Sequence, residues 1–215
     1  MKNKYYYELK SFAMNVYALI VFFAVLLVSP EFTLEADFTL SFLLSIPYFC
    51  LHEILHSIGY VINGADFKRI TYGAHIEQGI LCCSCKQEVD KKCVMWSLLY
   101  PFLFIGILTY AIGVIFHIPI LIVLSAANIS GCTGDISMFL AFLKIKDFKY
   151  FEYDNPLRFG IVTDENLEDK KFFGLKRVEE NDFKQTFDKK VNVSKTTIGM
   201  LILIAIFSLI IYFVD

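Results

Sequence analysis

The chain has 215 residues with a formal net charge of -2, and 56% of them are hydrophobic. This apolar content exceeds that of soluble globular proteins and indicates a membrane protein built as one polytopic domain. The balanced charge argues against a nucleic acid as a partner.

The chain begins with a basic, aromatic segment that leads into an apolar run. Lys2, Lys4 and Lys10 surround three consecutive tyrosines, a combination typical of the cytosolic edge of a membrane. Residues 12–29 are apolar and uncharged, close to the length that spans a bilayer. No small-x-small cleavage site follows, and Pro30 ends the run. We therefore expect an uncleaved first span with a cytosolic N-terminus.

The second apolar run, residues 39–62, contains His52-Glu53-Ile54-Leu55-His56. The acidic loop before it has no lysine or arginine, which predicts an outer loop and an inward-running span. Histidines four residues apart share one face of a helix and can bind one zinc ion, and the glutamate can act as a base on water. These polar residues are costly in a span and mark a functional site. Pro47 predicts a kink, either beside the site or for packing alone.

The next segment, residues 66–92, is a polar loop with several lysines, which places it in the cytosol. From Ile70 to Ile76, apolar and polar residues alternate with the period of a β-strand. Gln78-Gly79 predicts a turn into a second strand over residues 80–89. We therefore expect a short cytosolic β-hairpin between the second and third spans.

Two further spans are expected at residues 94–116, running outward, and residues 120–143, running inward. Residues 144–195 are charged and form a cytosolic soluble segment of mixed structure, with room for an amphipathic helix within residues 167–187. A last span is expected at residues 196–214, which leaves the C-terminus outside.

The expected fold class is therefore an all-α integral membrane protein with about five transmembrane helices, with its N-terminus in the cytosol and its C-terminus outside. Its expected parts are a membrane-embedded core over residues 1–143, with the first span at residues 12–29, a soluble segment over 144–195, and a C-terminal helix over 196–215.

A zinc site needs a third protein ligand and an open position for water. At a rise of 1.5 Å per residue, His52 lies about 16 Å, and Asp135 about 13 Å, above the cytosolic ends of their inward spans. The two residues are therefore nearly level, and Gly131 and Gly134 would allow their helices to approach closely. Asn128 lies near the same face, where it can polarise a substrate carbonyl, orient a ligand, or simply form an interhelical hydrogen bond.

Other candidate ligands are less well placed. His117 lies at the outer turn, His75 and Glu77 lie in the cytosolic loop, and Cys132 is on a different face from Asp135. Four cysteines, Cys82, Cys83, Cys85 and Cys93, cluster after the predicted turn. With His75 they could form a structural zinc site or serve a redox or persulfide role, but buried reduced thiols are the favoured interpretation.

The chain combines His52-Glu53-x-x-His56 with Cys85, Pro101, the stretch Asn128-x-x-Gly131-Cys132-x-Gly134-Asp135, and Asp154-x-Pro156-x-x-x-Gly160. Over roughly residues 45–165, this combination resembles a family of small bacterial membrane proteins of unknown function, described as putative zincin peptidases. More distantly, it resembles the site-two intramembrane metalloproteases. The resemblance implies that His52, His56 and Asp135 are zinc ligands and that Glu53 is the general base. Site-two proteases usually carry an Asn-x-x-Pro motif and an Asp-Gly pair. In this chain Gly131 stands at the proline position after Asn128, and Ile136 follows Asp135.

The sequence therefore predicts an intramembrane zinc metalloprotease that cleaves a membrane-associated protein or peptide, with Zn²⁺ as cofactor, the lipid bilayer as its environment, and Glu53 and Asn128 as catalytic residues. Two alternatives remain: an inactive metal-binding scaffold, and a metal-ion transporter. The intact glutamate argues against a scaffold, and the presence of one metal site only argues against a transporter.

Overall fold

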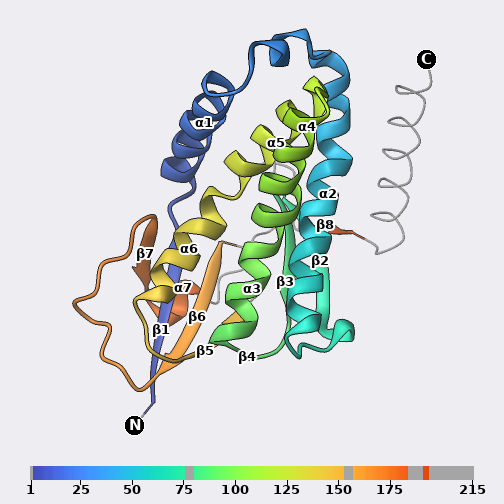
Figure 1. Ribbon diagram of the computed structural model, residues 1–215. Coiled ribbons are helices and arrows are strands. Elements are labelled where there is room, and N and C mark those ends of the chain that lie inside the picture. The colour runs from blue at the N-terminus through green and yellow to red at the C-terminus, as the bar shows by residue number, and fades with distance from the viewer. Residues whose placement is uncertain (1, 76–79, 153–156, 184–190, 194–215) are drawn as a thin grey trace.

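The computed structural model describes residues 2–75, 80–152, 157–183 and 191–193, and it contains both helices and β-sheets (Figure 1). The helices are α1 (Ser11–Leu27), α2 (Phe38–Ile62), α3 (Lys91–Pro101), α4 (Thr109–Ile115), α5 (Pro119–Gly131), α6 (Thr133–Leu143) and α7 (Glu180–Phe183). The strands are β1 (Asn3–Leu9), β2 (Ile70–His75), β3 (Ile80–Cys85), β4 (Val89–Asp90), β5 (Lys149–Glu152), β6 (Arg158–Thr163), β7 (Leu175–Val178) and β8 (Val191–Val193).

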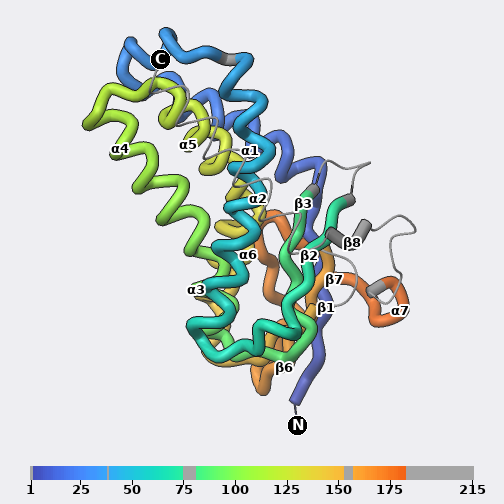
Figure 2. The backbone as a smooth tube through the Cα atoms, turned by 90° about the vertical axis from the view of Figure 1, so that its right-hand side faces the viewer, coloured from blue at the N-terminus to red at the C-terminus, as the bar shows by residue number. Residues whose placement is uncertain are grey.

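The expectation of an all-α protein is wrong. A five-stranded antiparallel sheet has the order β4-β5-β6-β1-β7, and a second sheet has the order β3-β2-β8. Figure 2 shows α3 and α4 on the opposite side of α2 from strands β2 and β3. The strands therefore form a layer beside the helices and are more than a small appendage to them.

Two helical stretches are long and apolar enough to cross a membrane. They are Thr39–Ile62 within α2 and Lys91–Ile115, in which a π-helical stretch joins α3 to α4. The pair α5 and α6 is a third candidate, but it bends by 47° at Cys132. The helix α1, at 17 residues, is shorter than either full span. The expected five spans thus reduce to two or three among the described residues, and the expected last span, residues 196–214, lies outside them.

The tyrosine-rich N-terminus forms a strand, which was not expected. Tyr5 and Tyr7 are buried while their neighbours are more exposed, which is the alternation of a strand with one covered face. Tyr7 pairs in register with Phe159 of β6, and their rings stack 5.8 Å apart. Phe142 of α6 meets Phe159 edge-on at 5.6 Å, so this face of the sheet packs against α6. The strand β1 pairs with strands that lie far away in the sequence, and local sequence periodicity does not reveal such pairing.

The predicted β-hairpin is present as an antiparallel pair of β2 and β3, with Tyr72 opposite Cys83. Its predicted turn, Gln78-Gly79, lies outside the described residues. The second strand ends at Cys85 and does not reach residue 89, because Val89 belongs to β4 in the other sheet. The Tyr72 hydroxyl lies 2.7 Å from the Ser57 hydroxyl of α2, which fixes the hairpin against that helix.

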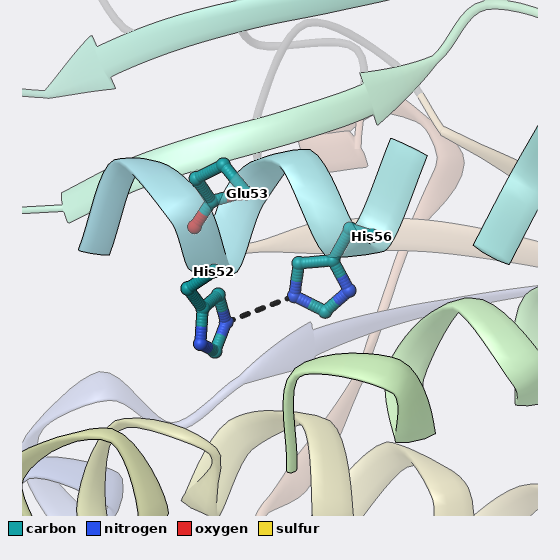
Figure 3. A group of neighbouring side chains, drawn as sticks. All are labelled: His52, Glu53 and His56. Carbon is teal, nitrogen blue, oxygen red and sulfur yellow. Dashed lines mark hydrogen bonds between the residues drawn. The ribbon is translucent and has the colours of Figure 1, made fainter. Parts of the chain in front are cut away.

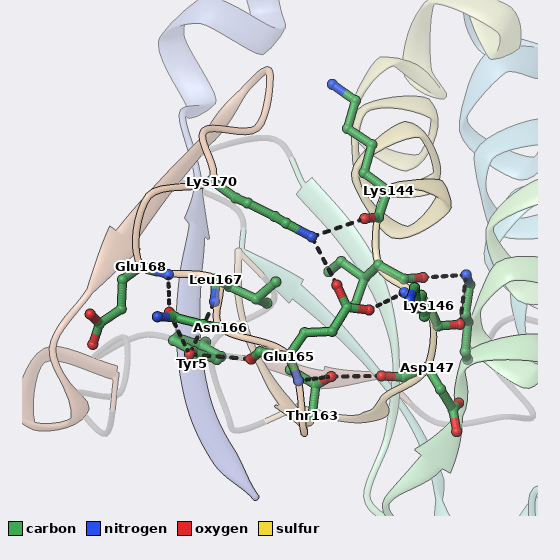
Figure 4. A network of polar contacts seen from close by, with 12 residues as sticks. Tyr5, Lys144, Lys146, Asp147, Thr163, Glu165, Asn166, Leu167, Glu168 and Lys170 are labelled. Carbon is green, nitrogen blue, oxygen red and sulfur yellow. Dashed lines mark hydrogen bonds and ion pairs between the residues drawn. The ribbon is translucent and has the colours of Figure 1, made fainter.

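A network of polar contacts attaches the C-terminal end of α6 to the loop after β6 (Figure 4). The Glu165 carboxylate accepts a hydrogen bond from the Lys146 backbone and pairs with Lys170 at 2.8 Å. Lys170 also donates to the Lys144 carbonyl at 3.3 Å. The amphipathic helix expected within residues 167–187 is not formed in its described part, because Leu175–Val178 is strand β7 and only Glu180–Phe183 is helical.

Close packing against α2 involves Gly59 and one of the two glycines expected, Gly131. A Cβ at Gly59 would lie 2.6 Å from the Ser97 Cα, so α2 and α3 touch backbone to backbone there. A Cβ at Gly131 would lie 3.2 Å from a ring carbon of Phe49 in α2, which is closer than an ordinary contact, whereas at Gly134 the nearest atom would be a Leu9 methyl at 3.8 Å. The close approach of α3 to α2 at Gly59 was not expected.

Candidate metal centre

The helix α2 holds both histidines on one face. It begins at Asp37, whose side chain accepts a hydrogen bond from the Leu40 N–H and caps the helix. Four residues of helix bring His52 and His56 one above the other, and their rings turn toward one another (Figure 3). Their Nε2 atoms lie 3.0 Å apart, and both side chains are buried.

The other ring nitrogen of each histidine faces an oxygen acceptor. The Nδ1 of His52 lies 2.8 Å from the Asn128 side-chain oxygen, and the Nδ1 of His56 lies 2.9 Å from the Ser97 carbonyl oxygen. A carbonyl oxygen can only accept, so each Nδ1 donates its proton and each Nε2 carries a lone pair. Two lone pairs that face one another at 3.0 Å repel unless a cation lies between them. The donor set therefore fits a metal ion.

Asp135 completes this set from the first turn of α6, directly after the break at Cys132. Its Oδ2 lies 3.4 Å from the Nε2 of His52 and 3.5 Å from the Nε2 of His56. Ligand atoms on a tetrahedral zinc with bonds of 2.0–2.1 Å are about 3.3 Å apart. The three separations match that spacing, and the structure brings together the three residues that were predicted as ligands.

Asn128 is fully buried in α5 and lies behind the ligands. Its amide nitrogen donates to the Pro101 carbonyl at 3.1 Å, which turns its oxygen toward His52. The π-helical stretch that begins after Pro101 leaves backbone carbonyls for such side chains to bind, and Ser125 takes another, that of Gly106. Asn128 is absent from the lining of the cavity, and the contact that the structure shows for it is with the candidate ligand His52.

Of the rival ligands, Cys132 lies beside the site. Its sulfur is 4.0 Å from the Nδ1 of His52, and His52, Cys132 and Asp135 offer ligand atoms within 4.8 Å of one another. His117 packs against Phe32 at the turn between α4 and α5, and the side chain of His75 lies outside the described residues. Glu77 also lies outside the described residues.

A cavity of about 270 Å³ opens in front of the histidines. Its helix side carries His52, Glu53, His56 and Asp135, and its other wall carries residues 81–84 of β3. A Glu53 carboxylate oxygen lies within 4.8 Å of a ring nitrogen of each histidine. A water or a peptide group entering the cavity would therefore meet the candidate base and the metal ligands together.

Glu152 also lines this cavity, and the sequence did not single it out. Its carboxylate accepts hydrogen bonds from the hydroxyls of Tyr150 at 2.6 Å and Tyr60 at 3.2 Å, and from the Cys85 N–H at 3.3 Å. Burial raises the pKa of Glu152, while these donors and Ser84 act in the opposite direction. It lies 99 residues after Glu53 on a strand that was not expected, so no local pattern connects the two.

The cysteine cluster does not form a metal site in the described part of the chain. Cys82 and Cys85 are three residues apart on a strand, so their side chains leave from opposite faces and do not converge on one ion. Burial raises the pKa of Cys85 to about 11. These features match the favoured interpretation of buried reduced thiols.

A comparison with protein families matches residues 45–149 to the family described as "Putative zincin peptidase". The matched range contains the histidine motif, Asn128 and Asp135. No curated protein and no solved structure matches the chain. The predicted resemblance is thus confirmed: residues 45–149 of the chain match the family of that description.

Proposed function

We propose that this protein is an intramembrane zinc metallopeptidase that cleaves a peptide bond of a membrane-associated substrate. The convergence of the two histidine Nε2 atoms and the Asp135 Oδ2 beside Glu53, at the wall of one cavity, carries the proposal. The family description supports a zinc peptidase in general. The location of His52 and His56 within the apolar run Thr39–Ile62 supports a site inside the membrane.

His52, His56 and Asp135 would hold the zinc ion. Bound there, zinc would supply Lewis acidity toward a peptide carbonyl and make water a nucleophile near neutral pH. Glu53 takes a proton from the attacking water and delivers it to the leaving amine. The side-chain oxygen of Asn128 and the carbonyl oxygen of Ser97 accept hydrogen bonds from the two Nδ1–H groups. This leaves a lone pair on each Nε2 that could bind the metal.

The open edge of β3 gives a substrate strand somewhere to bind. In the described residues, β3 pairs with β2 on one side only. The Lys86 N–H donates to the Arg69 carbonyl, so in an antiparallel pair the backbone groups of Cys83 and Leu81 point away from β2. They point toward the side on which the Cys85 N–H meets Glu152, and residues 81–84 line the cavity. A substrate segment that adds to this edge would lie beside Glu53 in extended form.

Glu53→Gln tests the proposed function, with Glu88→Gln as its control because Glu88 is exposed and far from the cavity lining. Membrane fragments from cells that produce wild type or either variant are compared by proteomics, and the zinc content of each purified protein is measured. We expect zinc in all three proteins, and an uncleaved substrate that accumulates only with Glu53→Gln. A scaffold or a transporter would give the same membrane proteins in all three, and that result would refute the proposal.

A further inference from the structure

Glu152 is a buried carboxylate that the proposed chemistry does not use, although it lines the same cavity as Glu53. Three donors from three different elements hold it: Tyr150 beside it, Tyr60 of α2, and the backbone of Cys85 in β3. These hydrogen bonds fix its position at the cavity wall. None of the ion pairs among the described residues involves Glu152.

The surroundings of the carboxylate contain negative charge without a balancing cation. Glu53, Asp135 and Glu152 all line the cavity, and no lysine or arginine is among its described lining residues. Burial, and then the negative charges of Glu53 and Glu152, hold the pKa of the Cys83 thiol well above its ordinary value. Cys83 therefore lies within electrostatic reach of both carboxylates. A zinc ion would balance the charge at Asp135, but Glu152 stands at another part of the wall.

Glu152 also marks a point along the open edge of β3. Its carboxylate accepts the hydrogen bond of the Cys85 N–H, so this N–H is not available to a substrate strand. A strand on this edge would pair with Leu81 and Cys83 and would meet the Glu152 carboxylate next to them. The substrate group at that point would face an anion in a partly dry site. A cationic nitrogen is the group that such a site stabilises most, because a charge-assisted hydrogen bond is stronger where water is excluded.

We propose that Glu152 is a specificity residue that binds a positively charged nitrogen of the substrate, either a lysine or arginine side chain or the free amino end of the chain. This inference rests on the proposed function, because it assumes that a peptide occupies the cavity. A purely structural Glu152 would tie β5 to β3 and α2 without any preference for charge in the ligand.

Binding of peptide hydroxamates to purified, zinc-loaded protein tests the proposal, because the hydroxamate anchors each ligand at the metal. The parent ligand is an acetylated norleucine peptide hydroxamate. In a first series, lysine replaces norleucine at each position in turn; in a second, the parent keeps a free amino end. We expect one cationic ligand to bind about tenfold or more tightly than the parent, as one charged hydrogen bond contributes. Which series contains it identifies the source of the charge.

Glu152→Gln should remove this preference, so that the variant binds the cationic ligand and the parent equally well, while the exposed control Glu88→Gln should retain the preference. Equal affinities of wild type for parent and cationic ligands would overturn the proposal, and so would a preference that persists in Glu152→Gln. A protein that cleaves peptides without a charge preference loses only this inference. A protein that shows the Glu152-dependent preference but cleaves nothing loses only the proposed function.

Discussion

Replacing Asn128 with alanine tests whether the metal centre depends on a residue that touches neither metal nor substrate. The change removes the acceptor of the His52 Nδ1 proton and the donor to the Pro101 carbonyl, at 2.8 and 3.1 Å. Both partners stay buried, and each unsatisfied group costs about 1–3 kcal/mol of folding stability. The His52 ring also loses the contact that fixes its tautomer, which lowers zinc affinity by about 10- to 100-fold.

Ser125→Ala is the matched control, because Ser125 is equally buried on α5 and also binds a backbone carbonyl, that of Gly106 at 2.5 Å. It has no contact with either histidine. Zinc affinity is measured by competition with a fluorescent chelator, and stability by thermal unfolding of the metal-free proteins. Both variants should be less stable, but only Asn128→Ala should bind zinc more weakly. Equal zinc affinities in the two variants would refute the orienting role.

Three further outcomes are expected. Gly59→Ala should lower stability by about 1–3 kcal/mol because its methyl group would meet the Ser97 backbone, whereas Gly134→Ala should be tolerated; thermal unfolding distinguishes them. The raised pKa of Glu152 means that its ionisation opposes folding as the pH rises. Glu152→Gln should therefore lose less stability than wild type as the pH rises above 4.5, when thermal unfolding is compared with each protein's own stability below pH 4.5, where the carboxyl is protonated in both states. Cys83→Pro should abolish substrate cleavage because it removes an N–H from the open edge of β3, and Cys83→Ala should retain cleavage.

The convergence of the three candidate ligands was predictable because two of them lie about one helical turn apart. A spacing of four residues places His52 and His56 on one face of a helix. Asp135 was selected by an estimate of its depth along two apolar helices. The role of Asn128 was less accessible, because it depends on the Pro101 carbonyl and hence on a π-helical stretch that composition does not reveal. Glu152 was missed because its three donors come from parts of the chain that only the folded structure brings together.

The sheet was missed for a related reason. Tyr5, Tyr6 and Tyr7 are consecutive, so the residue types do not alternate as in a half-buried strand, and the partners of Tyr5 and Tyr7 in β6 lie about 150 residues away. The β-hairpin was predicted because β2 and β3 are neighbours in sequence, apolar and polar residues alternate from Ile70 to Ile76, and Gln78-Gly79 predicts a turn between the strands. Strand pairing is visible in a sequence when it is local and invisible when it is not.

The bend at Cys132 links the metal centre to the sheet. Asp135 is three residues beyond the bend, so a turn of 47° changes its height by only about 1.5 Å. This is why a depth estimated for straight helices still selected it. Phe142, ten residues beyond the bend, is displaced sideways by about 11 Å, and its ring packs on Phe159 of the sheet. The break that directs Asp135 toward the histidines therefore also carries the end of α6 onto the sheet, and a straight fourth span would have lost both contacts.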